Sequence, residues 1–122
     1  MTDSYSIDDG RFLVSLARTA IAEYLSKRRV IDPPADTPGH LLEKSGVFVT
    51  LNLAKPTRTL RGCIGYPLPT EPLAVATIQS AIEAATGDPR FEPVELSEFK
   101  QKIAVEVSVL TIPEELTAKE PT

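Results

Sequence analysis

Cysteine is almost absent from this chain of 122 residues, which contains only Cys63. A single cysteine excludes a disulfide within the chain and any metal site made of several cysteines, and it is typical of a reducing compartment. Long hydrophobic runs are missing too, since the longest falls well short of the roughly 18 residues that a membrane-spanning helix needs. The first residues, Met1 to Ser4, lack the basic lead and apolar core of a signal peptide. These absences predict a cytoplasmic protein without a membrane segment.

Positive charge is also in deficit, because 13 lysines and arginines face 17 aspartates and glutamates, for a net charge of -4. Proteins that bind nucleic acid usually carry a basic surface, so this balance argues against nucleic acid as a partner. Only Arg58, Arg61 and the cluster Lys27 to Arg29 would support such binding. The composition is otherwise that of an ordinary globular protein, and the length predicts one domain over residues 1–122.

The spacing of apolar residues predicts two long helices. Apolar residues recur every three to four positions between Ser6, a predicted N-cap, and a basic end at Lys27 to Arg29. A second helix is predicted from Pro72 to Thr86, apolar on most of its sides and closed by Gly87 as a left-handed cap. Residues 96–100 predict one further helical turn.

Three stretches are predicted to be strands: residues 46–53, 60–66 and 103–110. Proline in the connection 55–58 favours a turn, so the first two strands should form an antiparallel hairpin. Thr50 and Asn52 then point away from the apolar face and could lie beside Arg61 or Cys63, depending on the register. No further strand is expected after the third. The polar tail from Glu114 should fray, and the open strand edge should favour a homo-oligomer.

The second of these strands holds the most site-like feature of the chain, the sequence L-R-G-C-I-G at residues 60–65. A period of two places Arg61, Cys63 and Gly65 on one face, so the guanidinium should lie beside the thiol. Leu60 and Gly62 fall on the other face. Two glycines in one strand predict a bulge, or a place where a ligand or another backbone comes close.

A second charged motif follows the second helix, where Asp88 and Arg90 lie two residues apart in a loop bounded by prolines. We expect the flanking loops to turn this helix back, so that Asp88 and Arg90 meet the hexapeptide strand in one site. His40, the only histidine, follows a proline-rich loop and has no obvious Cys or Asp partner. It is therefore predicted to be solvated rather than catalytic.

The hexapeptide L-R-G-C-I-G resembles the signature of the AMMECR-one family. Three further stretches agree in the same order: residues 46–51, the D-P-R-F-x-P loop at residues 88–93, and residues 106–110. The resemblance covers roughly residues 10 to 116. Prokaryotic members are also called protein A of the AmmeMemoRadiSam system, because they occur with a Memo-like protein and a radical SAM protein.

This resemblance implies an α+β fold, with an antiparallel sheet, helices packed on it, and the hexapeptide near a cleft. It implies a Memo-like protein and a radical SAM protein as partners, but no settled reaction. We expect no cofactor and no metal ion. Family members normally continue well beyond the position that corresponds to Thr122, so the chain is expected to lack the C-terminal part of the usual domain.

Three classes of function remain open, and the chain is not assigned as an enzyme. In the first, Cys63 is a nucleophile or thiol ligand whose thiolate Arg61 stabilises. Gly62 and Gly65 then admit a small-molecule ligand or substrate, which Asp88, Arg90 or Glu106 binds. In the second, the two motifs form a docking surface for partner proteins, and Cys63 is a small packing residue. In the third, the chain associates with nucleic acid as a regulator.

Overall fold

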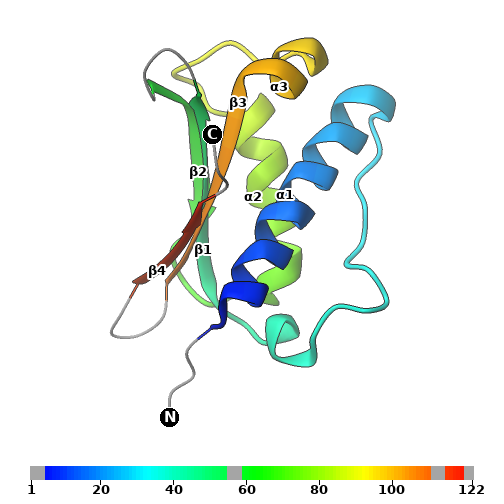
Figure 1. The fold of residues 1–122 in the computed structure, drawn as a ribbon, viewed down its shortest axis with the longest axis vertical. Coiled ribbons are helices and arrows are strands. Elements are labelled where there is room, and N and C mark those ends of the chain that lie inside the picture. Colours follow the sequence, from blue (N-terminus) through cyan, green and yellow to red (C-terminus); the bar gives the residue numbers. More distant parts are fainter. Residues whose placement is uncertain (1–4, 55–58, 111–114, 120–122) are drawn as a thin grey trace.

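The computed structural model describes residues 5–54, 59–110 and 115–119 of the chain. It is an α+β fold in which a four-stranded antiparallel sheet carries helices on one face (Figure 1). The elements in chain order are α1 (Ile7–Lys27), the short 3-10 helix η1 (Gly39–Leu42), β1 (Gly46–Leu53), β2 (Thr59–Tyr66), α2 (Leu73–Thr86), α3 (Leu96–Lys102), β3 (Ile103–Leu110) and β4 (Glu115–Lys119). The predicted helices and the three predicted strands are confirmed within one or two residues at their ends.

The sheet has the order β2-β1-β3-β4, and every neighbouring pair is antiparallel. The hairpin of β1 and β2 is confirmed, although its predicted turn at 55–58 lies outside the described residues. The fourth strand contradicts the prediction that nothing pairs after β3. Strand β4 is polar and short, so its sequence gives little strand signal, but its backbone pairs with β3. Ala118 also packs against Gly10 of α1, where a Cβ would lie 2.8 Å from the alanine Cβ.

Helix α1 begins at the predicted cap. The Ser6 hydroxyl accepts a hydrogen bond from the N–H of Asp9, whose carboxylate accepts one from the N–H of Ser6. This reciprocal capping box satisfies two N–H groups that the first turn leaves without helical partners. The helix ends at Arg28, which adopts the left-handed conformation with φ of 57°.

Helix α2 is largely buried, as its nearly uniform apolar surface predicts. It ends at Gly87, but with φ of -119°, so the predicted left-handed cap is wrong. A Cβ on Gly87 would meet the carboxylate of Glu83 one turn earlier, but this carboxylate is the end of a flexible, exposed side chain that can move aside.

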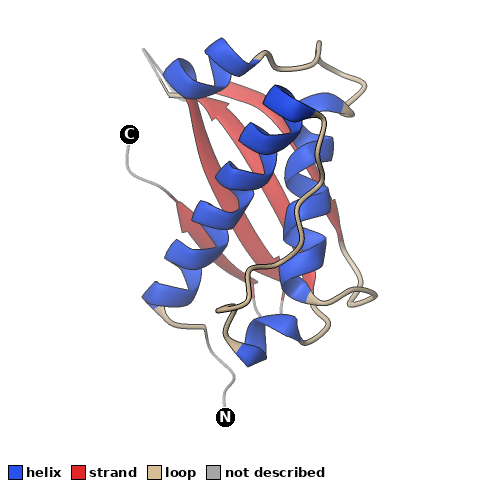
Figure 2. Cartoon of the chain, turned by 90° about the vertical axis from the view of Figure 1, so that its right-hand side faces the viewer, coloured by secondary structure: helices blue, strands red, loops and turns tan. Residues whose placement is uncertain are grey.

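The core lies between the sheet and the helices α1 and α2, which lie side by side over the same face (Figure 2). Alternate residues of β1 and β3 point into it and are almost fully buried: Val47, Val49, Leu51, Val105, Val107 and Val109. Burial of each such side chain contributes about 1.5–3 kcal/mol to folding. No helix of the described ranges lies against the opposite face of the sheet, which we call the open face. Within the same ranges, no helix has the length and apolar character needed to cross a bilayer.

Candidate functional site

The hexapeptide forms most of β2, and one irregularity decides how its side chains are arranged. Leu51 of β1 pairs with Gly62 and the next residue, Asn52, pairs with Leu60, so Arg61 is an extra residue in β2. This is the bulge that the two glycines predict. The bulge interrupts the period of two, because it moves Leu60 onto the open face with Asn52. The predicted placement of Leu60 with Gly62 is therefore wrong, whereas Cys63 does lie on the open face.

Cys63 is half-buried on the open face and is not part of the hydrophobic core. Its partner across the hairpin is Thr50, and the thiol sulfur lies 3.2 Å from the Thr50 hydroxyl oxygen. The N–H of Cys63 points away from β1, to the outer edge of the sheet, where it donates to Asp88. The two residues therefore form a non-hydrogen-bonded pair, the geometry in which side chains of neighbouring strands approach most closely.

The Asp88 carboxylate is the organising group at this edge, because it joins Cys63 to Arg90. Its side chain is only 2% exposed. One oxygen, Oδ2, accepts the Cys63 N–H at 3.0 Å and the Arg90 Nη2 at 2.7 Å. The other, Oδ1, accepts the backbone N–H and the Nε of Arg90, both at 3.0 Å. The prediction that the two motifs meet in space is confirmed.

The charges in this cluster reinforce one another. The bidentate hydrogen bond from Arg90 holds the pKa of the Asp88 carboxyl well below its ordinary value of 3.8, although burial of the carboxyl acts in the opposite direction. The same bond raises the pKa of Arg90, and the negative charge of a Cys63 thiolate adds to that rise. The guanidinium and the thiol are thus within electrostatic reach of each other.

Arg90 is held firmly but remains accessible, since 56% of its side chain is exposed. Its guanidinium lies 5.3 Å from the centre of the Phe91 ring. Asp88 engages Nε and Nη2, while Nη1 has no partner among the described residues. One amino group of a fixed arginine is therefore left without a partner among the described residues, and its guanidinium is within electrostatic reach of the thiol.

Glu106 lies in the same row of the sheet. It pairs with Thr50 from the β3 side, while Cys63 pairs with Thr50 from the β2 side. The backbone register thus places Cys63, Thr50 and Glu106 next to one another across three strands, all on the open face. Four of the predicted site residues, Cys63, Asp88, Arg90 and Glu106, are gathered in this region.

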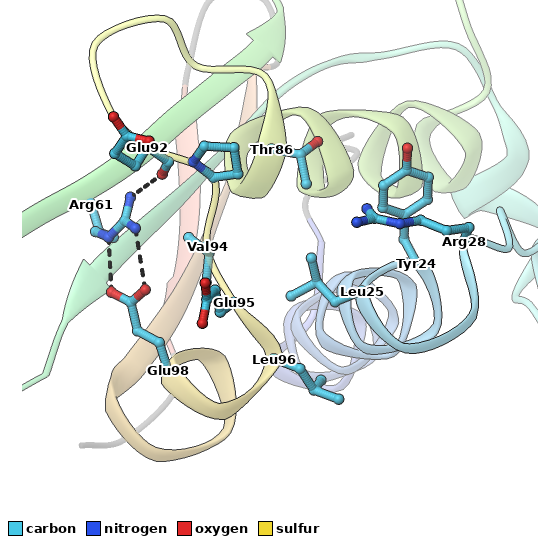
Figure 3. A pocket seen from close by; sticks show the side chains of 11 residues that line it. Tyr24, Leu25, Arg28, Arg61, Thr86, Glu92, Val94, Glu95, Leu96 and Glu98 are labelled. Carbon is cyan, nitrogen blue, oxygen red and sulfur yellow. Dashed lines mark hydrogen bonds and ion pairs between the residues drawn. The ribbon is translucent and has the colours of Figure 1, made fainter.

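Arg61 does not lie beside the thiol, which corrects the prediction that its guanidinium stabilises Cys63. Its Nε and Nη2 bind the two carboxylate oxygens of Glu98 at 2.9 and 3.2 Å, and its Nη1 donates to the carbonyl oxygen of Glu92 (Figure 3). The guanidinium therefore ties β2 to α3 and to the loop before it. The 37-residue separation of Arg61 from Glu98 leaves no local signal that would predict this pair.

The Arg61 ion pair borders an open groove of about 910 Å³ between the ends of α1 and α2 and the segment before α3 (Figure 3). Leu25, Val94 and Leu96 supply apolar lining, and Tyr24 with Arg28 lies across the groove from Arg61. The thiol of Cys63 is not part of this lining. The groove and the Cys63 cluster are therefore two separate features.

The two hexapeptide glycines serve close packing. A Cβ on Gly62 would collide with the carbonyl oxygen of Ala84, so the absence of a side chain lets α2 lie directly on β2. A Cβ on Gly65 would collide with the carbonyl oxygen of Val47, and Phe48 lies over the same position. Both positions confirm the predicted close approach of another backbone, and Gly62 points to the helix side rather than to the Cys63 site.

His40 has an aspartate partner that the sequence did not indicate, although 52% of its side chain is exposed, as expected of a solvated histidine. Its Nε2 lies 2.8 Å from Oδ2 of Asp9, and its ring stacks on Tyr5. Burial raises the pKa of the Asp9 carboxyl, but the hydrogen bonds from His40 and Ser6 outweigh it and lower the pKa overall. The pair fastens η1 to the start of α1, and sequence reasoning missed it because 31 residues separate the partners.

The basic cluster at the end of α1 is engaged with its own helix. Lys27 and Arg29 lie 3.7 and 3.8 Å from the Glu23 carboxylate, and the Arg28 guanidinium lies over the Tyr24 ring. Cations at a helix C-terminus also interact favourably with the helix dipole. These contacts give the cluster a structural role without nucleic acid. Arg58 lies outside the described residues.

Comparison with known proteins identifies the family. A family model described as AMMECR1 matches residues 14–121, which is most of the chain. The chain belongs to the AMMECR1 family. Among its relatives, a protein of Thermococcus gammatolerans is 60% identical over 114 residues, covering 90% of this chain and 55% of that protein. A protein of Methanopyrus kandleri is 47% identical over 121 residues, covering 99% and 58% of the two chains.

A solved structure agrees with the fold. The crystal structure of an uncharacterized protein from Pyrococcus horikoshii matches with a TM-score of 0.80 and 55% identity, over 84% of this chain and 51% of that one. The chain thus spans about half the length of the relatives it matches. In the AMMECR1 chain, Cys63 and Glu106 lie on the open face of the sheet, and Asp88 with Arg90 lies at the adjoining edge.

Proposed function

We propose that the AMMECR1 chain contributes a binding site for a ligand or substrate that carries a carboxylate or another small anionic group. The site is the open face of the sheet at Cys63, together with the adjoining edge at Arg90. One observation carries this proposal: the buried Asp88 carboxylate holds the Cys63 backbone and the Arg90 guanidinium at once. A fixed guanidinium with an unpartnered amino group is a common anion-binding arrangement, and in this chain it lies within electrostatic reach of the only thiol.

Two observations support a binding role over a packing role for Cys63. Its side chain lies on the face opposite the core, where a packing residue would be expected to point inward. Its neighbours are polar, with the Thr50 hydroxyl in contact and the Glu106 backbone one strand further along the row. Polar groups gathered around a half-buried thiol favour a ligand over a hydrophobic contact.

The single cysteine offers a direct test, because every alkylation event reports on Cys63. The folded protein is treated with iodoacetate and with iodoacetamide at low ionic strength, and the ratio of the two rates is measured by mass spectrometry. The intrinsic reactivity of the thiol affects both rates equally, so their ratio depends on the charge of the reagent. A cation about 6 Å away should change the rate for the anionic reagent by about threefold.

We therefore expect the iodoacetate-to-iodoacetamide ratio to fall about threefold in Arg90→Gln and to stay near wild type in Arg90→Lys, which keeps the charge. Arg11→Gln is the matched control, since that arginine is 79% exposed at the far start of α1. Circular dichroism confirms that each variant is folded. A ratio that is the same in Arg90→Gln and the wild type overturns the proposal, as does a folded chain whose thiol reacts with neither reagent.

We also propose that the chain acts together with a Memo-like protein and a radical SAM protein, as the family resemblance implies. The association is suggested only by the family resemblance of the hexapeptide and of the D-P-R-F-x-P loop. Co-purification of the three proteins after joint expression would test it, and three proteins that elute separately at micromolar concentrations would contradict it.

A further inference from the structure

Strand β2 forms one edge of the sheet, and several hydrogen-bonding groups of Cys63 and Gly65 on its outer side have no partner among the described residues. The outward N–H of Cys63 fixes which groups these are. Because alternate residues of a strand present their N–H and C=O to the same side, the N–H and C=O of Gly65 also point outward, as does the C=O of Cys63. Of these four groups, only the Cys63 N–H is bonded within the described part of the chain, to Asp88.

An exposed edge of this kind is a template for another strand, and natural proteins usually protect it with charge, proline or a covering segment. In this sheet, Asp88 protects the edge at Cys63 alone. Gly65 lies two residues, or about 7 Å, further along the strand. Beyond Gly65, Leu68 is 66% exposed just after β2. The part of the edge that starts at Gly65 therefore combines open backbone groups with an exposed apolar side chain, which suits a peptide.

We propose that the edge of β2 at Gly65 binds an extended peptide whose C-terminal carboxylate is held by Arg90. The inference rests on the proposed anion site and specifies its ligand. The peptide runs antiparallel to β2, and one of its residues forms the paired N–H···O=C bonds with Gly65. Peptides bind to sheet edges in this way in several recognition domains, where backbone hydrogen bonds supply much of the affinity.

The Asp88–Arg90 pair explains why the peptide should end at this point. Asp88 already occupies the Cys63 N–H, so an added strand cannot continue its hydrogen bonding past Gly65 toward Leu60. The guanidinium of Arg90 lies at this stopping point and supplies the positive charge that a terminal carboxylate needs. Gly65 itself has no side chain to obstruct the approaching backbone. The thiol of Cys63 then lies next to the last residue of the bound peptide.

The test uses acetyl-Val-Ala-Val-Ala with a free C-terminal carboxylate, added to the isotopically labelled protein. The amide exchange of Gly65 is followed by NMR, because a hydrogen bond to the peptide slows exchange at that N–H. We expect at least fivefold slower exchange at saturating peptide, with little change at Ile64, whose N–H points toward β1. The same peptide with a C-terminal amide should bind about tenfold more weakly, and Arg90→Gln should remove that difference.

Peptides methylated at a single backbone nitrogen serve as the register control. Methylation of the N–H that faces Gly65 should abolish the slowed exchange, whereas methylation of the next N–H, which faces away, should leave it. Absence of slowed exchange with every peptide overturns the inference. So does equal binding of the acid and amide peptides, or slowed exchange that grows with protein concentration alone, which would show that a second copy pairs with β2.

Failure of this inference is distinguishable from failure of the anion site. If iodoacetate is attracted by Arg90 but the peptide leaves Gly65 unchanged, the anion site stands and its ligand is not a peptide. If Arg90→Gln leaves the alkylation ratio unchanged, the anion site itself is wrong, and the carboxylate anchor fails with it.

Discussion

At the scale of single residues, the two glycines of the hexapeptide are needed for lack of space and not for backbone conformation. Neither Gly62 nor Gly65 has a positive φ. Each is required because a neighbouring backbone occupies the space of its missing Cβ. The sequence predicts this need from two glycines within one strand, but it cannot say that Gly62 faces a helix and Gly65 faces the neighbouring strand.

Gly62 gives a direct test of that packing. We expect Gly62→Ala to lower the free energy of unfolding by about 1–3 kcal/mol, because the new methyl group meets the rigid backbone carbonyl of Ala84 rather than a flexible side chain. Urea unfolding followed by circular dichroism measures the change. Gly39→Ala is the matched control, since a Cβ there meets nothing within 4 Å and should change stability by less than about 0.5 kcal/mol. Equal effects of the two substitutions would show that α2 does not rest on Gly62.

The sequence predicts which residues belong to the candidate site, but not which of them contact one another. Asp88, Arg90 and Cys63 stand out in the sequence as charged or nucleophilic residues within distinctive motifs, and the structure brings them together. The prediction that Arg61 lies beside the Cys63 thiol was wrong, because the arginine near the thiol is Arg90. Pairing of this kind depends on which loop passes a particular strand position, and that is settled by tertiary packing rather than by local spacing.

At the scale of elements, strand alternation and helical periodicity predict strands β1, β2 and β3 and the helices, since each pattern reflects one face buried in the core. Two element-level features were not predictable. The bulge at Arg61 shifts the start of β2 by one residue and reverses the face of Leu60. Strand β4 has too few apolar residues to show a pattern, and backbone pairing with β3 forms it. Both features arise from pairing with a neighbouring strand, so they cannot be predicted from the residues of the element itself.

At the scale of the whole molecule, polar contacts join elements that lie far apart in the sequence. Asp9 with His40 connects η1 to α1, and Asp88 with Cys63 connects the end of α2 to the edge of β2. Arg61 with Glu98 connects β2 to α3. Two of these three contacts hold a carboxyl group whose pKa is lowered in the folded chain. Stability should therefore depend on pH through Asp9 and Asp88 in particular.

The direction of that dependence follows from linkage between protonation and folding. The pKa of Asp88 lies well below 3.8 in the folded chain, chiefly because Arg90 donates to its carboxylate, so the unfolded chain takes up a proton more readily. The stabilisation is then fully present above about pH 5 and is lost as the pH falls through about 4 toward the folded pKa. We expect the melting temperature of the wild type to fall steeply over this acidic range.

Asp88→Asn isolates the contribution of this one carboxylate, because the amide keeps the size of the side chain and removes its charge. Its melting temperature should lie below that of the wild type at pH 7, and the gap should narrow steadily as the pH falls below about 4, where the wild-type carboxyl also becomes neutral. Asp32→Asn, in an exposed loop, is the control, and its melting temperature should stay close to that of the wild type at every pH. If the melting temperatures of Asp88→Asn and the wild type differ by the same amount at every pH from 7 to about 2, the Asp88 carboxylate does not fasten α2 to the edge of β2.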